Sequence, residues 1–291
     1  MKNKYDLTII VVNYNGRFWL KKTLESLKEF YLNKTNSQVK TIVVDNHSND
    51  DSTSLIKRSF RWVELIELPE NLGFAAGNNV ALTQALKDSE FIMLLNSDTQ
   101  LTDDSNLDEL IQVLNKRADI GIITPKLALS SGEIDLACHR GEPTLWASAT
   151  YFLGLETSLP QNKLFSQYHQ TYKDLNALHT IDACSGAAMI IRTSAIKKVG
   201  LLDEQFFMYA EDLDWCRRFR EAGYLILYYP LVTIIHHKHK SGIQSNFQVR
   251  QRETRSHFYD TMLQYFDKHN RGSSRMTRWL VKTIINLKKG V

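Results

Sequence analysis

An apolar run near the N-terminus places the strongest constraint on the fold. Residues Leu7–Val12 are aliphatic except for one threonine, without the polar residue at every second position that a half-exposed strand carries. A strand of this kind is buried on both faces, which is typical of a parallel sheet covered by helices. The run is too short for the core of a signal peptide, and no segment approaches the ~18 apolar residues that cross a membrane.

The first half of the chain continues as an alternation of short apolar strands and helical patterns. The strands expected after the first are 39–44, 63–68, 91–95 and 120–124, and the helices between them are 20–31, 54–59, 75–86 and 107–116. Ser105, with Asp108 three residues later, is expected to cap the last helix. This alternation predicts an α/β fold with a doubly wound, mostly parallel, Rossmann-like sheet.

Regular patterning breaks off at Leu127 and resumes near Ile181, and the stretch between them has no assigned structure. The elements expected beyond it are a strand over 187–192, a short helix capped by Thr193 and ended by Gly200, a helix over 211–222, and strands over 225–229 and 232–235. Residues 249–291 have a helical pattern.

Composition and charge narrow the class of protein. The chain has 43% apolar and 23% charged residues, which excludes a wholly disordered chain. Its net charge of +4 is too small to indicate a nucleic-acid partner. Cys138, Cys184 and Cys216 cannot all pair with one another, so we expect a reduced, cytoplasmic protein rather than a disulfide scaffold.

Polar residues follow three of the expected strands at the point where each ends. Asn13 and Asn15 follow the first strand, Asp45 closes the second, and Asn96 and Asp98 follow the fourth. Ligands of open α/β sheets bind at the carboxyl ends of the strands, so these residues mark a binding site. The sequence has neither a P-loop nor a G-x-G-x-x-G turn, which excludes P-loop enzymes and dinucleotide-dependent dehydrogenases.

Five motifs in order resemble the inverting glycosyltransferases of family 2, most closely the bacterial rhamnosyltransferase-like branch that builds surface polysaccharides. The similarity runs from about Leu7 to Lys268. The motifs are TIIVVNYNG, VVDNHSND, NLGFAAGNN, LLNSDT and SGAAMIIRTSAIKKVGLLDEQFFMYAEDLDWCRRFREAGY. The resemblance implies a GT-A fold over residues 1–245, with a nucleotide-binding half over about 1–126 and an acceptor-binding half over about 127–245, followed by a C-terminal helical segment over 246–291.

The resemblance also implies a metal-dependent, inverting hexosyltransferase. Its leading donor is dTDP-L-rhamnose, and its acceptor is a saccharide or a polyprenyl-linked saccharide; a UDP-hexose donor is the first alternative. A nucleotidyltransferase would need a glycine-rich first loop with a basic residue, which residues 13–16 do not provide. A non-catalytic protein that binds a sugar nucleotide or a partner also stays open, because Asn96-Ser97-Asp98 keeps one carboxylate of the family's D-x-D element.

Donor and metal residues follow from the resemblance, motif by motif. An expelled diphosphate calls for a divalent cation, here Mg²⁺ or Mn²⁺, with Asp98 as one ligand. His236 fits best as a second ligand, and His237 is its alternative on the opposite face of an extended segment. The donor-binding residues are Asn13 and Asn15 at the base, Asp45 at the base or ribose, Asn71, Gly73 and Asn78 in a turn that passes close to the donor, and Asn96 with Asp98.

Asp212 is the candidate catalytic residue, because an inverting transfer needs one base to deprotonate the acceptor hydroxyl. It heads an apolar stripe on its helix that points inward, formed by residues at i+3, i+4 and i+7. Glu211 and Asp214 lie on other faces and are expected to cap the helix start. Acceptor contacts are expected from Glu211 and from Trp146, as the floor of the acceptor site.

The last 24 residues are basic and amphipathic, with no acidic side chain after Asp267. Two hypotheses stay open for residues 271–291: contact with an anionic membrane surface, or packing on the chain's own domain or a partner subunit. The first would place a cytoplasmic enzyme on the inner face of the cytoplasmic membrane. A homodimer is the oligomer we consider.

Overall fold

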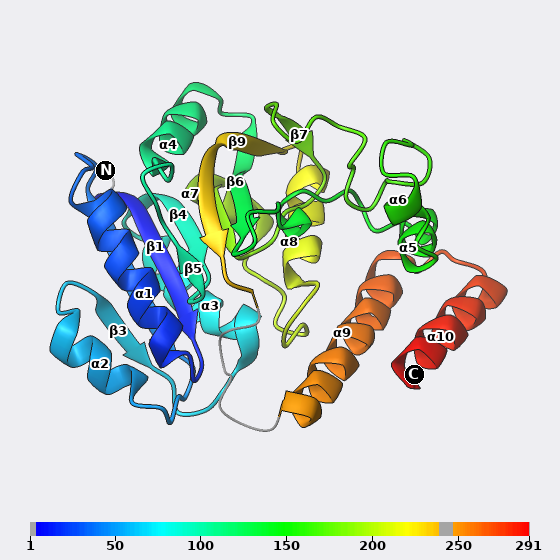
Figure 1. Ribbon diagram of the computed structural model, residues 1–291, viewed down its shortest axis with the longest axis horizontal. Coiled ribbons are helices and arrows are strands. Elements are labelled where there is room, and N and C mark those ends of the chain that lie inside the picture. The colour runs from blue at the N-terminus through cyan, green and yellow to red at the C-terminus, as the bar shows by residue number, and fades with distance from the viewer. Residues whose placement is uncertain (1–3, 239–246, 291) are drawn as a thin grey trace.

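The computed structural model describes the backbone of residues 4–238 and 247–290 and the side chains of 4–238 and 257–289. Within this part of the chain a single mixed sheet runs in the order β3-β2-β1-β4-β8-β6-β9-β5, with β7 paired to β9 (Figure 1). The strands are β1 (Tyr5–Asn13), β2 (Val39–Asp45), β3 (Glu64–Glu67), β4 (Ser89–Leu95), β5 (Thr99–Gln100), β6 (Ile120–Leu129), β7 (His179–Ile181), β8 (Ala188–Arg192) and β9 (Leu225–His236).

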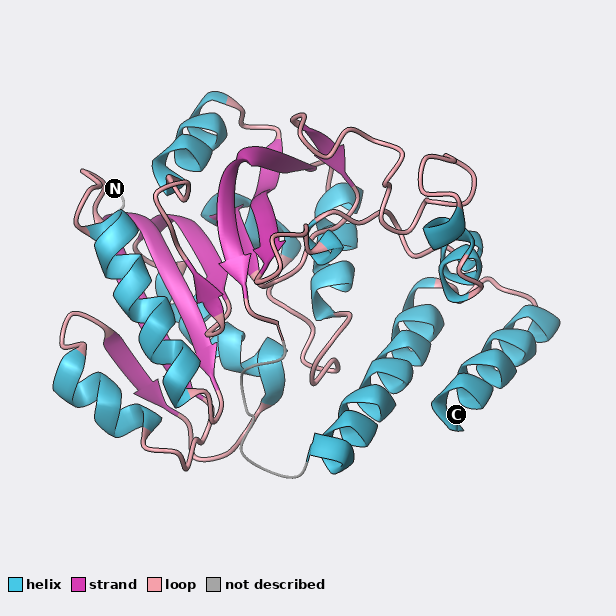
Figure 2. Cartoon of the chain, viewed as in Figure 1, coloured by secondary structure: helices cyan, strands magenta, loops and turns pink. Residues whose placement is uncertain are grey.

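Helices cover both faces of this sheet, as the doubly wound prediction requires (Figure 2). Helix α3 packs on β1, β2 and β4, with α7 beside it on β4 and β8, whereas α4 and α8 pack on β9. The helices are α1 (Arg17–Leu27), α2 (Ser52–Ser59), α3 (Gly73–Ala85), α4 (Leu107–Lys116), α5 (Leu145–Phe152), α6 (Leu155–Ser158), α7 (Thr193–Val199), α8 (Glu211–Glu221), α9 (Phe247–His269) and α10 (Arg275–Gly290). A π-turn (Lys28–Leu32) extends α1, and a 3₁₀ turn (Leu136–Cys138) follows β6.

The strand assignments of the first half are confirmed. The aliphatic residues of β1 from Leu7 to Val11 are fully buried, because β2 and β4 flank the strand in parallel and helices lie on both faces. The order changes after β4, since β8 enters between β4 and β6 and runs antiparallel to both. The stretch without assigned structure holds the end of β6, the 3₁₀ turn, α5, α6 and β7.

Three local expectations were wrong. Ser105 does not cap α4: its hydroxyl donates to the carbonyl of Thr233, and Asn106 takes the cap position. Thr193 lies inside α7 and makes no cap, although Gly200 does end that helix at a positive φ of 92°. The two strands expected around Pro230 are one strand, because β9 continues past the proline through a bulge against β6.

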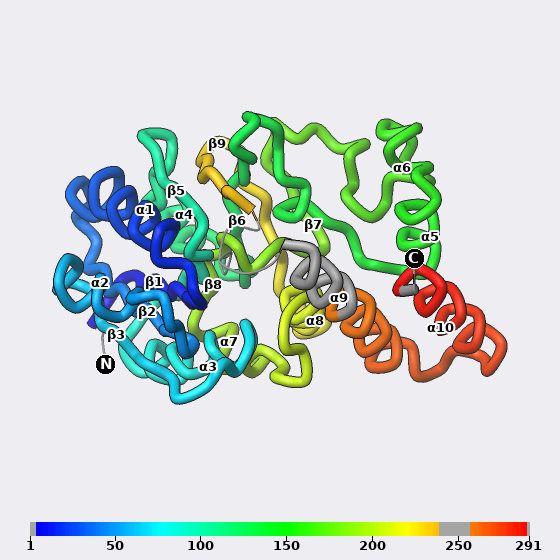
Figure 3. Tube along the Cα trace, turned by 60° about the horizontal axis from the view of Figure 1, so that its bottom comes forward, coloured from blue at the N-terminus to red at the C-terminus, as the bar shows by residue number. Residues whose placement is uncertain are grey.

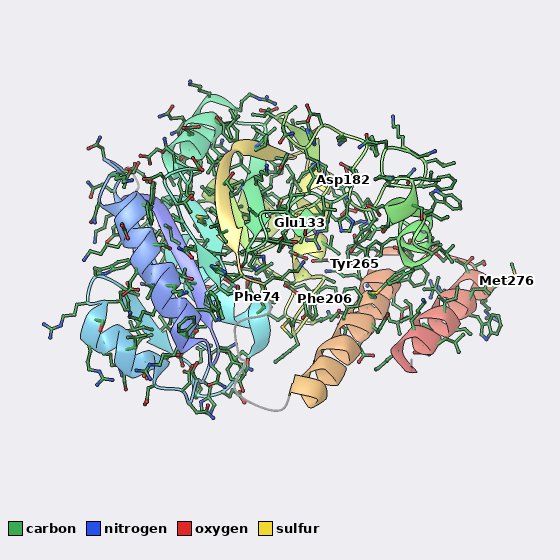
Figure 4. All side chains as sticks on the ribbon, in the orientation of Figure 1. Phe74, Glu133, Asp182, Phe206, Tyr265 and Met276 are labelled. Atoms are coloured by element: carbon green, nitrogen blue, oxygen red, sulfur yellow. The ribbon has the colours of Figure 1, made fainter. Side chains whose placement is uncertain are left out.

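The C-terminal helices lie outside the sheet. Figure 3 shows α9 crossing beside α8, with α10 folding back along it at the end of the molecule that also carries α5 and α6. Tyr265 of α9 points back to the sheet domain, where its hydroxyl donates to Glu142 over 2.9 Å (Figure 4). Within the described residues, no helix is long and apolar enough to cross a membrane.

Candidate active site

The carboxyl ends of β1, β2, β4, β6 and β9 lie along one edge of the sheet, and the start of β8 lies beside the end of β4. The backbone N–H of Asn96 donates to the carbonyl of Ala187 over 2.9 Å. The next residue back, Gly186, donates its N–H to the carboxylate of Asp212 over 3.4 Å. The turn that holds Asp98 and the start of α8 therefore meet at this edge.

Asn13 and Asp45 form a buried polar pair at the ends of neighbouring strands. The side-chain amide of Asn13 donates to the carboxylate of Asp45 over 3.1 Å and to the hydroxyl of Ser48 over 3.2 Å. The backbone N–H of Ser48 also donates to the carboxylate of Asp45, over 2.8 Å. Asn15 has a positive φ of 49° and accepts from the N–H of Asn49. The buried Oδ1 of Asn13 has no hydrogen-bond partner within the described residues, so it is an unsatisfied acceptor at the ends of these strands.

The NLGFAAGNN segment forms the turn into α3, and Asn71 and Asn78 make local hydrogen bonds there, whereas Asn79 bonds to the segment before α8. Asn71 accepts from the N–H of Gly73 over 3.0 Å, and Asn78 donates to the carbonyl of Phe74 over 2.8 Å. Gly73 has a φ of +82°, and an added Cβ would lie 2.3 Å from the carbonyl oxygen of Phe207. The close approach made by this glycine is thus to the segment before α8, and donor contacts by Asn71, Gly73 and Asn78 stay a prediction.

Substitution Gly73→Ala should lower the free energy of unfolding by ~3 kcal/mol, because the new side chain adds a backbone clash to an unfavourable φ. Gly132→Ala is the matched control: its φ is +87°, but its Cβ would meet nothing within 4 Å, so only the ~1 kcal/mol strain applies. Urea unfolding of both variants measures the difference. Equal losses would show that the contact with Phe207 contributes nothing.

Asp98 and His236 come together at the ends of β4 and β9. Nε2 of His236 lies 3.4 Å from Oδ1 of Asp98, and its Nδ1 lies 2.8 Å from Oδ2 of Asp135. Burial lowers the pKa of His236, but the hydrogen bonds to Asp135 and Asp98 outweigh burial and raise it to about 9. The arrangement places one imidazole between two carboxylates, each of them buried.

The side chains of Asp98 and His236 are suitable ligands for a divalent cation that is also bound by a diphosphate. A carboxylate oxygen and an imidazole nitrogen face each other, and Asp135 fixes the tautomer and the direction of the ring, as carboxylates do for metal-binding histidines. Among the described residues, no three His, Cys, Asp or Glu side chains are placed so that together they could hold a metal ion. Asp98 and His236 would hold the cation from the protein side, and diphosphate and water would supply its other ligands.

His237, the alternative to His236, has a different environment. Its ring lies against Trp19 with the ring centroids 4.3 Å apart, and its nitrogens bond to Ser130 and to Gln100 over 2.8 and 3.0 Å. The extended backbone does place neighbouring side chains on opposite faces, as the sequence predicted. His236 is therefore the histidine whose ring faces Asp98.

Asp212 is 8% exposed, and the side chain of Arg140 holds its carboxylate in place. The guanidinium of Arg140 donates to its Oδ2 over 2.6 Å, and both side chains are largely buried. Trp215, Cys216 and Phe219 are fully buried, which confirms the inward-pointing stripe on α8. Asp212 is thus a buried carboxylate at the sheet edge with a fixed orientation.

Glu211 is a second buried carboxyl group beside the first, at 6% exposure. Burial and the charge of Asp212 raise the pKa of Glu211 well above its usual range, so a protonated, hydrogen-bond-donating side chain is favoured. Tyr209 and Ala210, directly before it, have positive φ values of 72° and 63°. Strained backbone of this kind is concentrated at functional sites, and here it sets the direction in which α8 begins.

The expectation that Glu211 and Asp214 cap α8 was wrong, since the helix has no side-chain cap and both residues are buried. Asp214 is fully buried among three basic side chains. Its carboxylate lies 2.8 Å from Arg218, 2.5 Å from Lys268 and 2.7 Å from His269. Lys268 and His269 belong to α9, so this cluster joins the C-terminal helices to α8.

Asp214→Asn should lower the free energy of unfolding by ~3 kcal/mol at pH 7, because it leaves a buried basic cluster without its anion. Burial alone would raise the pKa of Asp214. Hydrogen bonds from His269 and Lys268 outweigh burial and hold this pKa at about 2, below its value in the unfolded chain. The stabilisation is therefore present above about pH 4 and is lost as pH falls through about 2. Urea unfolding of the wild type and Asp214→Asn at pH 7 and pH 2 measures the loss, and Asp119→Asn, at an exposed position, is the control. If the wild type and Asp214→Asn differ in free energy of unfolding as much at pH 2 as at pH 7, the role of the Asp214 carboxylate is contradicted.

Trp146 is half-exposed, and its indole N–H donates to the carbonyl of Leu164. It lines an open cleft at the side of α8. The other residues that line this cleft are Glu142, Pro143, Thr144, Leu145, Arg217, Arg220, Glu221 and Asn270. Arg217 of α8 donates to Glu142 over 3.0 Å in this cleft, whereas Asp212 and Arg140 are buried and do not line it.

Sequence reasoning missed Asp135 and Arg140, which orient His236 and Asp212. Both lie in the stretch that had no assigned structure, and each meets its partner across 72 or more residues of sequence. The only local signal was an Asp at the start of a short turn, where Asp135 accepts from the N–H of Ala137.

Comparison with known proteins identifies the family of the chain. The sequence model of Glycosyl transferase family 2 matches residues 8–200. The N-acetylglucosaminyl-diphospho-decaprenol L-rhamnosyltransferase of Mycobacterium tuberculosis is 24% identical, over 97% of this chain and 91% of the relative. Rhamnosyltransferase WbbL of Escherichia coli is 26% identical, over 79% of this chain and 83% of the relative.

A solved structure supports the fold. The mannosyltransferase of Pyrobaculum calidifontis in complex with GDP-Man and Mn²⁺ superposes with a TM-score of 0.60 at 16% identity, and the alignment covers 99% of this chain and 71% of that one. The sheet, its helices and the polar edge thus define an enzyme of the GT-A class of glycosyltransferases. Within this class, the chain belongs to glycosyltransferase family 2, with relatives among the rhamnosyltransferases.

Proposed function

We propose that this enzyme transfers L-rhamnose from dTDP-L-rhamnose to a lipid-linked saccharide during the synthesis of a bacterial surface polysaccharide. The observation that carries the proposal is the meeting of Asp98, His236 and Asp212 at one edge of the sheet. Two relatives named as rhamnosyltransferases support the sugar, and one of them is named for a lipid-diphosphate acceptor.

Each residue has one role in the proposed transfer. Asn13 and Asp45 hold the nucleoside at the ends of β1 and β2. Asp98 and His236 would hold Mg²⁺ or Mn²⁺, which would neutralise the charge of the leaving diphosphate; a GT-A structure that contains Mn²⁺ supports this cofactor. Asn15, Asn71, Gly73, Asn78 and Asn96 complete the proposed donor site.

Asp212 acts as the base. As the acceptor oxygen bonds to the anomeric carbon, its proton passes to Asp212, and the bond from that carbon to the diphosphate oxygen breaks on the opposite face. Arg140 keeps the carboxylate in one orientation, because it donates to the oxygen that does not take the proton. Glu211 donates a hydrogen bond to the acceptor, and Trp146 forms the floor of the acceptor cleft.

Three regions of the chain have different roles in the proposed function. Residues of about 1–126 bind the nucleotide, those of about 127–245 bind the acceptor, and 246–291 form a separate helical segment. Because a polyprenyl-linked acceptor lies in a bilayer, we place the enzyme on the inner face of the cytoplasmic membrane, in contact through 271–291. A homodimer stays a prediction.

Thermal unfolding with dTDP, UDP and GDP, each with and without Mn²⁺, tests the donor site. A ligand at 100 times its dissociation constant adds about 2.7 kcal/mol of stability, so binding gives a clear shift. We expect a shift with dTDP that grows with Mn²⁺. A thermal shift with UDP alone would indicate a UDP-sugar donor in place of dTDP-L-rhamnose. If no nucleotide shifts the unfolding temperature, the whole proposal is contradicted.

A further inference from the structure

Helix α10 presents its apolar side chains to solvent. Five of them have exposed fractions between 44% and 70%: Met276, Trp279, Leu280, Ile284 and Leu287. With about 100° of rotation per residue, the five fall within an arc of about 140° on one side of the helix. We call this set the α10 apolar face. Met276 marks its N-terminal end in Figure 4, where the side chain projects away from the rest of the molecule.

The opposite side of α10 is the side that packs on α9. Ile285 is 7% exposed, and Lys282 and Lys289 reach back to Asp267 and Asp260 over 3.1 and 2.6 Å. A surface helix normally turns its apolar stripe to its own domain. Here the domain is contacted by the other side, so packing on the chain's own domain does not account for the α10 apolar face.

The charge of this segment identifies what covers the face. From residue 268 to 291 the chain has no Asp or Glu. The basic residues within 271–291 are Arg271, Arg275, Arg278, Lys282, Lys288 and Lys289. A second copy that docked through the same face would bring two basic segments together, and their charges would repel. An anionic surface that also accepts apolar side chains is complementary to both properties.

We propose that the α10 apolar face inserts into the interface of an anionic phospholipid bilayer, with Arg275 and Lys288, which flank this face on the helix, on the lipid headgroups and Trp279 at the boundary between headgroups and chains. The proposal deepens the proposed function and rests on it for the lipid-linked acceptor. Helices α5 and α6 lie at the same end of the molecule in Figures 1 and 3.

The position of the acceptor cleft agrees with this docking. Asn270 lines the cleft and belongs to the short connection between α9 and α10, and Trp146 lines it from α5. Exposed leucines at 145, 153 and 159 add apolar surface on α5, after α5 and after α6. A lipid-linked acceptor held by the bilayer would thus meet the enzyme at the end where the cleft opens beside α8.

Co-sedimentation with vesicles tests the proposal. The variant Trp279→Ser/Ile284→Ser/Leu287→Ser should bind vesicles of mixed phosphatidylcholine and phosphatidylglycerol at least about tenfold more weakly than the wild type, and the wild type should lose affinity in high salt or on phosphatidylcholine alone. The matched control is Phe18→Ser/Leu231→Ser, which removes apolar side chains of similar exposure far from α10. It should bind like the wild type.

Two results would overturn the docking surface: equal vesicle binding by the triple variant and the wild type, or no binding by the wild type. A dimer in sedimentation velocity that only the triple variant loses, without vesicle binding, would assign the face to a second copy. The dTDP shift with Mn²⁺ separates the two proposals. If it is absent while vesicle binding depends on the α10 apolar face, the donor assignment fails and the docking surface stands.

Discussion

Replacement of Asp212 by asparagine should reduce sugar transfer by about 10³-fold, because the amide cannot take the proton of the acceptor hydroxyl. The side chain keeps its size and can still accept from Arg140, so the nucleotide site should stay formed. The buried guanidinium loses its anion, so the free energy of unfolding should fall by ~3 kcal/mol. The measurement is the initial rate of transfer together with the thermal shift caused by dTDP and Mn²⁺. We expect the rate to be lost and the shift to be retained.

Asp119→Asn is the control for this experiment, because Asp119 is half-exposed and directly precedes β6, at the edge of the sheet opposite the site. Its rate should equal that of the wild type. Two outcomes would remove Asp212 from the role of base. One is a transfer rate within a few-fold of the wild type; the other is loss of the dTDP shift, which would make Asp212 a structural support.

Replacement of Asp98 by asparagine should weaken the metal-dependent binding of the donor and lower the rate by at least about 10²-fold, because a neutral amide is a poorer ligand for a hard divalent cation. The Mn²⁺-dependent part of the dTDP shift should disappear. Asp135→Asn should have a smaller effect of about tenfold on metal affinity, since Asp135 orients His236 without facing the cation.

Asp103→Asn is the matched control for Asp98→Asn, because it lies five residues later on the exposed loop and pairs only with Lys34 in the contacts of the described residues. It should leave both the shift and the rate unchanged. An Asp98→Asn enzyme that keeps its full response to Mn²⁺ would exclude this carboxylate as a metal ligand.

Local sequence patterns were sufficient for the strands and helices of the first half. The aliphatic run of β1 and the periodic leucines of α1 and α4 reflect burial that each element makes with its neighbours in the chain. The antiparallel entry of β8 between β4 and β6 could not be predicted in this way. Its sequence pattern is that of any buried strand, and its direction is set by pairing with segments about 70 to 100 residues earlier.

The residues of the candidate site also fall into those that local sequence patterns indicate and those that long-range contacts bring in. Asp98, His236 and Asp212 stand in short motifs at the ends of elements, so the sequence alone was sufficient to propose them, and their roles stay predictions. Arg140 and Asp135 act on them through contacts that only the folded chain makes. The helical periodicity of α8 placed Asp214 on a different face from Asp212, and it could not predict that Lys268 and His269 of α9 contact Asp214 there.

The configuration of the glycosidic bond that the enzyme forms is the most direct test of an inverting transfer with Asp212 as the base. The enzyme would be incubated with Mn²⁺, dTDP-L-rhamnose and a synthetic lipid-diphosphate N-acetylglucosamine, and the product examined by mass spectrometry and NMR. We predict a disaccharide with one added deoxyhexose, an anomeric configuration opposite to that of the donor, and no product with Asp212→Asn. Retention of the donor's configuration, or equal product from Asp212→Asn, would contradict the assignment of Asp212 as the base of an inverting transfer.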